Sequence, residues 1–158
     1  MIQVYYGYGK GKTSAAIGAG MRAKGAGKSV LLVQFLKDNK SSELSVLPFE
    51  IYEAPESLPF NPDKSYLKWV EDACKAVAET ECDVVILDEF LDVIPEFVAL
   101  DDAVQTIKML SVDLNKEVFV TGHKEQKEIF DVADYLTYFE KIKHPYDLGV
   151  KARKGIEY

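Results

Sequence analysis

The string GYGKGKTS at residues 7–14 constrains the fold of this chain more than any other feature. It directly follows Ile2–Tyr6, a run with strand character, and it leads into Thr13–Ala26, where small residues and Met21 suit a helix packed closely on a sheet. A Gly-rich turn between a strand and a helix is typical of a phosphate-binding loop. The alternative is a flexible glycine turn with solvated lysines.

Each residue type in this string suits phosphate binding. Glycines allow backbone angles that point successive N–H groups inward, and the helix N-terminus adds partial positive charge at the same place. Lys12 supplies a full positive charge and is a candidate catalytic residue, Thr13 offers a hydroxyl to magnesium, and Ser14 can cap or assist. The standard loop has Gly where this chain has Tyr6, so the loop is one residue shorter, and the position of the phosphates in it stays open. The predicted nucleotide-binding residues here are Gly7, Tyr8, Gly9, Lys10, Gly11, Lys12, Thr13 and Ser14.

A second feature, which is acidic, follows further along the chain. Val84–Leu87 is an apolar run that ends in Asp88 and Glu89. A neighbouring strand that ends in this way can present a carboxylate to the magnesium ion of a bound nucleotide. We therefore expect Thr13, Asp88 and Glu89 to hold Mg²⁺, directly or through water, and Glu89 to be a candidate catalytic residue. A surface acid pair that closes a strand is the alternative.

The remaining pattern alternates strands and helices. Nearly continuous apolar runs are typical of parallel strands that are covered on both faces, and ligands of such sheets bind at the carboxyl ends of the strands. We expect an α/β fold of the P-loop NTPase (RecA-like) type, a three-layer sandwich with a mostly parallel central sheet. The predicted strands after the first are Ser29–Phe35, Phe49–Tyr52, Asp83–Leu87, Glu117–Thr121 and Tyr135–Phe139, and the predicted helices after the first are Asp63–Glu81, Leu100–Ser111 and Glu125–Val132.

Size and composition limit the possible classes of protein. A chain of 158 residues buries one sizeable core, so we expect one domain over residues 1–158, with an irregular substrate loop around residues 38–62 and a basic tail at 141–158. No apolar run reaches the roughly 18 residues of a membrane span, and no signal peptide is visible, so a cytoplasmic protein is expected. The two cysteines, Cys74 and Cys82, indicate neither a disulfide framework nor a zinc site.

The charge is unevenly distributed. The net charge of −7 argues against a general nucleic-acid binder, because duplex affinity comes largely from phosphate neutralisation. Residues 1–37 nevertheless contain six basic residues and no acidic one. This segment is predicted to hold a compact polyanion, the alternative being a solvated basic face.

These residues resemble a known family, the P-loop type of ATP:corrinoid adenosyltransferase, also called cob(I)alamin adenosyltransferase. The string at residues 7–14 is similar to the shortened loop of that family, and Leu87-Asp88-Glu89 is similar to its acidic strand end. At His123 the chain departs from the arginine that usually follows Thr-Gly in the family. Further similarity lies in Val33–Lys37, Thr121-Gly122, Lys143–Tyr146 and Ala152–Glu157.

The resemblance implies a reaction in which a Co(I) corrinoid attacks the ribose 5′-carbon of ATP and triphosphate departs. The implied cofactors are ATP and Mg²⁺ with a corrinoid as co-substrate, and the implied partners are an electron donor that reduces cobalt and a second copy in a homodimer. Arg22 and His144 are additional nucleotide-binding candidates, against a solvated helix arginine and a structural turn. Phe60, Tyr66 and Trp69 are candidates for the corrin face, with core or helix packing as the alternative.

Two other functions are compatible with the sequence. A small P-loop kinase of the nucleoside type would use the same loop and the same acids but would release ADP. A non-catalytic module that binds ATP or a corrinoid would need only the binding residues.

Overall fold

Six strands form one parallel sheet in the computed structural model, which describes residues 1–38, 41–55, 58 and 64–156. The strand order is β3-β2-β4-β5-β1-β6, and every neighbouring pair is parallel. The strands are β1 (Ile2–Tyr6), β2 (Val30–Gln34), β3 (Glu50–Tyr52), β4 (Val84–Asp88), β5 (Glu117–Gly122) and β6 (Tyr135–Tyr138). The helices are α1 (Lys12–Gly25), α2 (Lys64–Glu79), α3 (Leu100–Lys108) and α4 (Lys127–Phe130), with short turns η1 (Ser42–Ser45), η2 (Phe90–Asp92), η3 (Met109–Asp113) and η4 (Pro145–Leu148).

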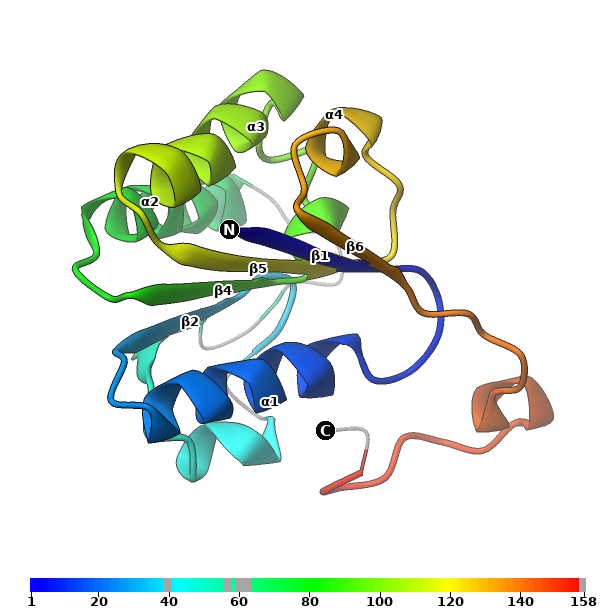
Figure 1. The fold of residues 1–158 in the computed structure, drawn as a ribbon. Coiled ribbons are helices and arrows are strands. Elements are labelled where there is room, and N and C mark those ends of the chain that lie inside the picture. The colour runs from blue at the N-terminus through cyan, green and yellow to red at the C-terminus, as the bar shows by residue number, and fades with distance from the viewer. Residues whose placement is uncertain (39–40, 56–57, 59–63, 157–158) are drawn as a thin grey trace.

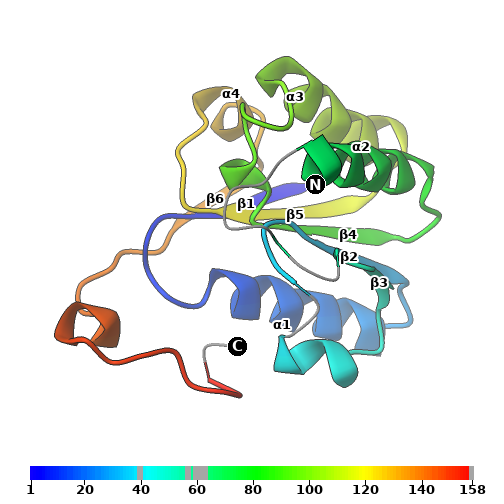
Figure 2. The ribbon, with the colours of Figure 1, turned by 180° about the vertical axis from the view of Figure 1, so that it is seen from behind.

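The helices cover both faces of the sheet. Helix α1 and η1 lie on one face, and α2, α3 and α4 lie on the other, as Figures 1 and 2 show from opposite sides. All five residues of β2 and all five of β4 are buried, as expected of parallel strands between two layers. A carbon added at Gly20 would lie 2.8 Å from Ile86, so glycine at this position lets α1 pack closely on β4. The predicted three-layer α/β fold is confirmed, with a fully parallel sheet.

Most predicted boundaries agree with the structure to within one residue, and the exceptions have local causes. The helix predicted at Glu125–Val132 ends at Phe130, because the N–H groups of Val132 and Ala133 bond three residues back and turn the chain into β6. The helix predicted at Leu100–Ser111 ends at Lys108 and continues as the wider turn η3. The helix predicted at Asp63–Glu81 ends at Glu79, and its predicted first position, 63, lies outside the described residues.

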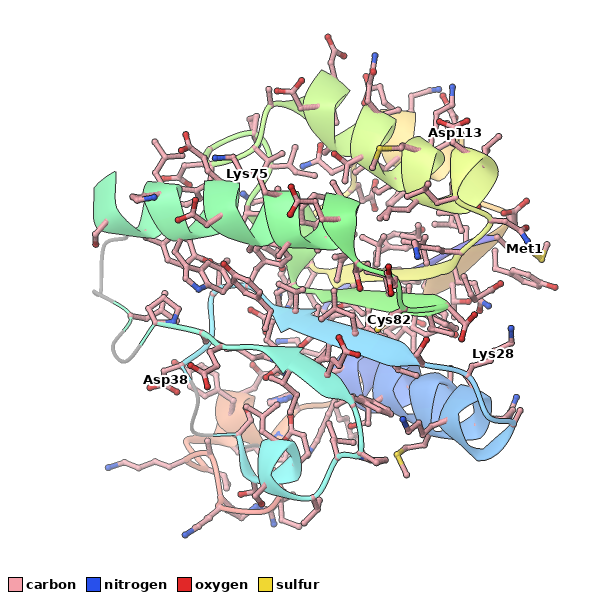
Figure 3. All side chains as sticks on the ribbon, turned by 90° about the vertical axis from the view of Figure 1, so that its left-hand side faces the viewer. Met1, Lys28, Asp38, Lys75, Cys82 and Asp113 are labelled. Carbon is pink, nitrogen blue, oxygen red and sulfur yellow. The ribbon has the colours of Figure 1, made fainter. Side chains whose placement is uncertain are left out.

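The topology gathers several loops at one edge of the sheet. The segments that follow β1, β2, β4 and β5 all leave the sheet at its carboxyl edge, where α1 begins. Figure 3 shows Asp38, shortly after β2, on one side of the molecule, and Lys28, before β2, on the other. Within the described residues, no helix is both long and apolar enough to cross a membrane. The predicted phosphate loop and the predicted acid pair both lie at this carboxyl edge.

Candidate functional site

The glycine-rich loop is held against the chain that follows β6. Gly7 and Gly11 have φ angles of +104° and +114°, which L side chains rarely adopt. The Gly9 N–H donates a 2.7 Å hydrogen bond to the Phe139 carbonyl, and a carbon added at Gly9 would lie 2.7 Å from the backbone of Phe139 and of Glu140. Glycine is therefore required here for close approach as well as for backbone angle.

Lys12 is the first residue of α1, and its side chain is buried over the loop. Only 8% of the residue is exposed, and its Nζ donates a 3.1 Å hydrogen bond to the Gly9 carbonyl. Burial lowers the pKa of Lys12, against the opposing attraction of Asp92, Glu89 and Asp88. The ammonium thus lies at the centre of the loop, in a mainly acidic surrounding.

Asp88, the last residue of β4, is fully buried and accepts hydrogen bonds from four side chains. Its Oδ1 accepts from the Thr13 hydroxyl at 2.9 Å and from the Thr121 hydroxyl at 2.7 Å. Its Oδ2 accepts from Lys37 Nζ at 2.6 Å and from Gln34 Nε2 at 3.2 Å. The carboxylate therefore joins β2, β5 and the start of α1 at one point.

Lys37 also lies close to the second acid. Its Nζ is 3.5 Å from Glu89 Oε1 and 3.2 Å from the Thr13 hydroxyl oxygen. Burial disfavours the Lys37 ammonium, but the attraction of Asp88 and Glu89 outweighs burial and raises the pKa of Lys37. Burial raises the pKa of Glu89, and the charge of Lys37 opposes that rise. Lys37, Thr13 and the two acids form a single polar cluster.

A third acid lies beside this cluster. Asp92 Oδ1 and Oδ2 accept the His123 N–H at 3.0 and 2.9 Å, and the His123 ring nitrogen Nδ1 lies 2.9 Å from Oδ2. Burial alone would raise the pKa of Asp92, but the hydrogen bonds from His123 and the Lys124 N–H outweigh burial and lower it. The exposed ring of Tyr8 lies 5.4 Å from the His123 ring, measured between centroids. Asp92 thus fixes the segment after β5 and extends the acidic side of the site.

The structure brings together some of the predicted nucleotide-binding residues and separates others. Tyr8, Lys10 and Ser14 lie in or beside the loop with exposed side chains. Arg22 lies in the last turn of α1, about 14 Å along the helix from Thr13. His144 lies after β6, where its Nδ1 accepts a 3.2 Å hydrogen bond from the Tyr146 N–H and caps η4.

The predicted corrin-facing residues do not form an open aromatic surface. Tyr66 is 2% exposed, and its hydroxyl accepts a 2.7 Å hydrogen bond from the Leu36 N–H. Trp69 is half-buried against Tyr66 and Phe35 and donates its indole N–H to the Glu53 carbonyl. Phe60 lies outside the described residues. Tyr66 and Trp69 therefore pack between α2 and the sheet.

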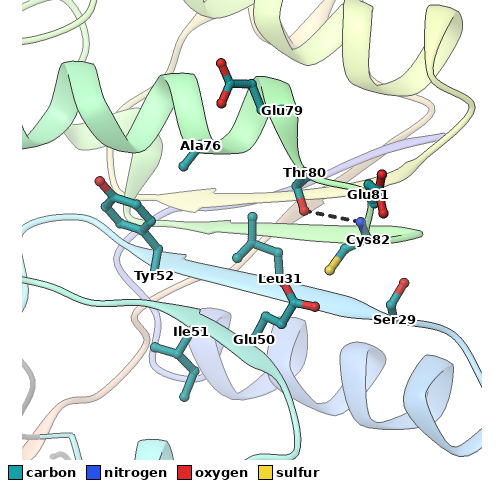
Figure 4. A pocket seen from close by; sticks show the side chains of 10 residues that line it. All are labelled: Ser29, Leu31, Glu50, Ile51, Tyr52, Ala76, Glu79, Thr80, Glu81 and Cys82. Atoms are coloured by element: carbon teal, nitrogen blue, oxygen red, sulfur yellow. Dashed lines mark hydrogen bonds between the residues drawn. The ribbon is translucent and has the colours of Figure 1, made fainter.

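A separate groove of about 850 Å³ lies at the opposite edge of the sheet. It is bordered by the beginnings of β2 and β3 and by the end of α2, and Figure 4 shows Glu50, Glu79 and Cys82 around it. It contains none of the residues predicted to bind nucleotide or metal. The cluster around Asp88 is therefore the candidate active site.

The whole sequence, residues 1–158, matches the family described as ATP:corrinoid adenosyltransferase BtuR/CobO/CobP. This chain belongs to that family. It is therefore a transferase that moves the adenosyl group of ATP to a corrinoid. ATP and a corrinoid are its substrates.

Similar proteins agree with this assignment. The chain is 32% identical over 169 residues to the corrinoid adenosyltransferase of Escherichia coli K12, and 31% identical over 175 residues to corrinoid adenosyltransferase CobA of Salmonella typhimurium. Each match covers 100% of this chain and 85% of the relative. Domain III of the Thermotoga maritima replication initiation protein DnaA has a TM-score of 0.53 and 14% identity, over 88% of this chain and 54% of that one. At that identity the likeness concerns the α/β fold alone, and this chain spans about half of the DnaA structure.

Sequence reasoning missed the roles of four residues at the site. Gln34 and Lys37 belong to a segment that the sequence marks only as similar to a strand of the family. Thr121 belongs to a segment that is marked only as similar to the end of another strand of the family. Asp92 was not singled out. A polar residue at the end of an otherwise apolar strand, as in VLLVQ and EVFVT, is a signal that could have indicated Gln34 and Thr121. No comparable signal marks Lys37 or Asp92.

Proposed function

We propose that the loop at residues 7–13 holds the triphosphate of ATP and that Thr13, Asp88 and Glu89 bind the accompanying Mg²⁺. The single observation that carries this proposal is the buried cluster in which the Thr13 hydroxyl and the Asp88 carboxylate meet at 2.9 Å. Thr13 is the second residue of α1, which follows the loop after β1, and Asp88 ends β4, which lies two positions from β1 in the sheet. A phosphate on the loop and a cation on the acids would therefore be neighbours.

The residues at the cluster suit magnesium. Mg²⁺ prefers oxygen ligands and commonly binds one or two carboxylates together with substrate phosphates. The cluster offers the Thr13 hydroxyl, the Asp88 carboxylate and the Glu89 carboxylate, and an ammonium already lies among them. When bound, the ion would neutralise charge on the triphosphate.

The chemistry that follows needs charge stabilisation more than proton transfer. The Co(I) centre of the corrinoid supplies an electron pair to the ribose 5′-carbon, the cobalt–carbon bond forms, and the carbon–oxygen bond breaks with its pair on triphosphate. No proton is removed from the nucleophile, so no general base is required. Lys12 and the loop N–H groups would stabilise the leaving group. The loss of one such donor typically raises the activation free energy by about 3–4 kcal/mol.

Other assignments follow from the same proposal. Tyr8, Lys10 and Ser14 would contact the nucleotide at the exposed rim of the loop, whereas Arg22 would require it to reach well beyond Thr13 along α1. His144 would contact it from the segment after β6. We further propose an external electron donor for the cobalt, a cytoplasmic location and a homodimer. The corrin would approach the exposed side of the loop, with Phe60 the remaining aromatic candidate, because Tyr66 and Trp69 pack inside.

Product analysis tests the reaction. Purified protein is mixed with ATP, Mg²⁺ and chemically reduced cobalamin, the cobalt–carbon bond is followed by absorbance, and phosphorus NMR identifies the phosphate product. Equal amounts of adenosylated corrinoid and free triphosphate are expected. ADP as the product would instead indicate a kinase, and binding without turnover would indicate a non-catalytic module.

A further inference from the structure

Lys37 contacts every side chain assigned above to the metal. Its ammonium lies 3.2 Å from the Thr13 hydroxyl, 2.6 Å from Asp88 Oδ2 and 3.5 Å from Glu89 Oε1. The ammonium thus lies among three side-chain oxygens, one from α1 and two at the end of β4, which are the oxygens proposed above to bind Mg²⁺. The family resemblance had marked Lys37 only as part of a similar strand.

The backbone is arranged to deliver this ammonium. Leu36 has a φ angle of +53° and Glu89 of +59°, conformations that non-glycine residues adopt rarely and at some energetic cost. The Leu36 N–H is fixed by the buried Tyr66 hydroxyl at 2.7 Å. Two unusual turns, one after β2 and one after β4, thus bring Lys37 and Glu89 together.

One buried acceptor at the cluster has no partner among the residues that the structure describes. Gln34 is 3% exposed, and its Nε2 donates to Asp88, but its Oε1 is buried without a hydrogen bond to any described group. Buried polar atoms are nearly always paired, so an orphaned oxygen beside a carboxylate suggests that a donor is added when the site is filled. A water molecule on a bound metal ion is a donor of this kind.

We propose that the Lys37 ammonium occupies the metal site among these oxygens in the nucleotide-free protein. It moves out of that site when triphosphate binds, and the metal ion takes its place. This inference rests on the proposed binding of Mg²⁺ and triphosphate at the same site. An ammonium and a divalent ion repel each other at this separation, so both occupy the cluster only when further negative charge is present. The triphosphate supplies that charge and gives Lys37 a new partner. Metal and nucleotide therefore enter together.

Manganese binding to the nucleotide-free protein tests this inference without any turnover. Mn²⁺ affinity is measured by electron paramagnetic resonance for the wild-type chain, for Lys37→Met and for the more polar Lys37→Gln. Removal of the ammonium is expected to tighten Mn²⁺ binding by about tenfold or more in both variants. Thermal unfolding should show each variant destabilised without metal and restored by Mn²⁺.

The matched control is Lys12→Met, which removes a neighbouring positive charge but no contact with the three oxygens. It should tighten Mn²⁺ binding much less than Lys37→Met does, and adding Asp88→Asn to Lys37→Met should abolish the gain. Equal Mn²⁺ affinity in wild type and Lys37→Met, or an equal gain in Lys12→Met, would overturn the inference. Neither ATP nor corrinoid is present, so a failure of adenosyl transfer would appear in the product assay and not here.

Discussion

Thr121 Oγ1 donates a 2.7 Å hydrogen bond to Asp88 Oδ1 and accepts a 2.9 Å hydrogen bond from the Glu89 N–H. One hydroxyl on β5 therefore fixes the carboxylate of the first acid and the backbone of the second. Thr121 is itself fully buried, so bulk solvent does not reach its hydroxyl. The pair of acids is positioned by the neighbouring strand as much as by its own.

Replacing Thr121 with valine should disturb both acids. Thr121→Val keeps the shape of the side chain but leaves the Glu89 N–H without a partner and Asp88 Oδ1 with the Thr13 hydroxyl as its remaining donor, at a cost of about 1–3 kcal/mol. Urea unfolding measures this loss, and calorimetry with magnesium-ATP should show weaker binding. Thr121→Ser, which retains the hydroxyl, should stay close to wild type in both measurements. Equal stability of the valine and serine variants would contradict this account.

Tyr66→Phe separates two explanations for that tyrosine. The substitution keeps the aromatic ring and removes the hydroxyl that accepts the Leu36 N–H. We expect a loss of about 1–2 kcal/mol in unfolding free energy and weaker magnesium-ATP binding, because the turn that carries Lys37 loses its anchor. The KM for the corrinoid should not change. A raised corrinoid KM with unchanged nucleotide affinity would instead favour a corrin contact.

Asp92 should make stability depend on pH in the acidic range. Its pKa is lowered in the folded protein, where burial is outweighed by hydrogen bonds from His123 and Lys124. Its contribution is therefore fully present above the unfolded pKa of about 3.9 and disappears as the pH falls through the lower folded pKa. Near pH 7 the free energy of unfolding, measured with urea, should be about 1–2 kcal/mol higher for wild type than for Asp92→Asn. This difference should shrink below about pH 4. A difference that grew on acidification would refute this assignment.

The sequence predicted the sheet and the loop well because both depend on local patterns. Apolar runs such as VVIL in β4 are buried on both faces, and the string at residues 7–14 sits between strand and helix as expected. The contacts of Lys37, by contrast, depend on the left-handed backbone conformation of Leu36. A glycine or asparagine would have indicated such a conformation, but a leucine does not. The sequence left Tyr66 open between a corrin contact and core packing, since a tyrosine on an amphipathic helix suits a core as well as a ligand.

The contact of Gly9 with the chain after β6 also required the structure. Gly9→Ala would place a carbon 2.7 Å from the backbone of Phe139 and Glu140, so the loop must shift. Magnesium-ATP binding should weaken by about tenfold or more, as measured by calorimetry. Gly18→Ala is the matched control, because Gly18 lies in α1 with nothing within 4 Å of the added carbon. It should leave binding unchanged and stabilise the protein by about 1 kcal/mol. Similar losses in the two variants would exclude the contact as the cause.

The most direct test of the account is the binding of inorganic tripolyphosphate with Mg²⁺, measured by calorimetry for wild type and Lys12→Met. This probe carries the triphosphate chain without adenosine or corrinoid, so it reports only on the loop, Lys12 and the acids after β4. Wild type should bind it, and Lys12→Met should bind it about a hundredfold more weakly, since a buried charge-assisted contact is lost. Equal affinity in the two proteins would contradict the claim that residues 7–13 grip the triphosphate.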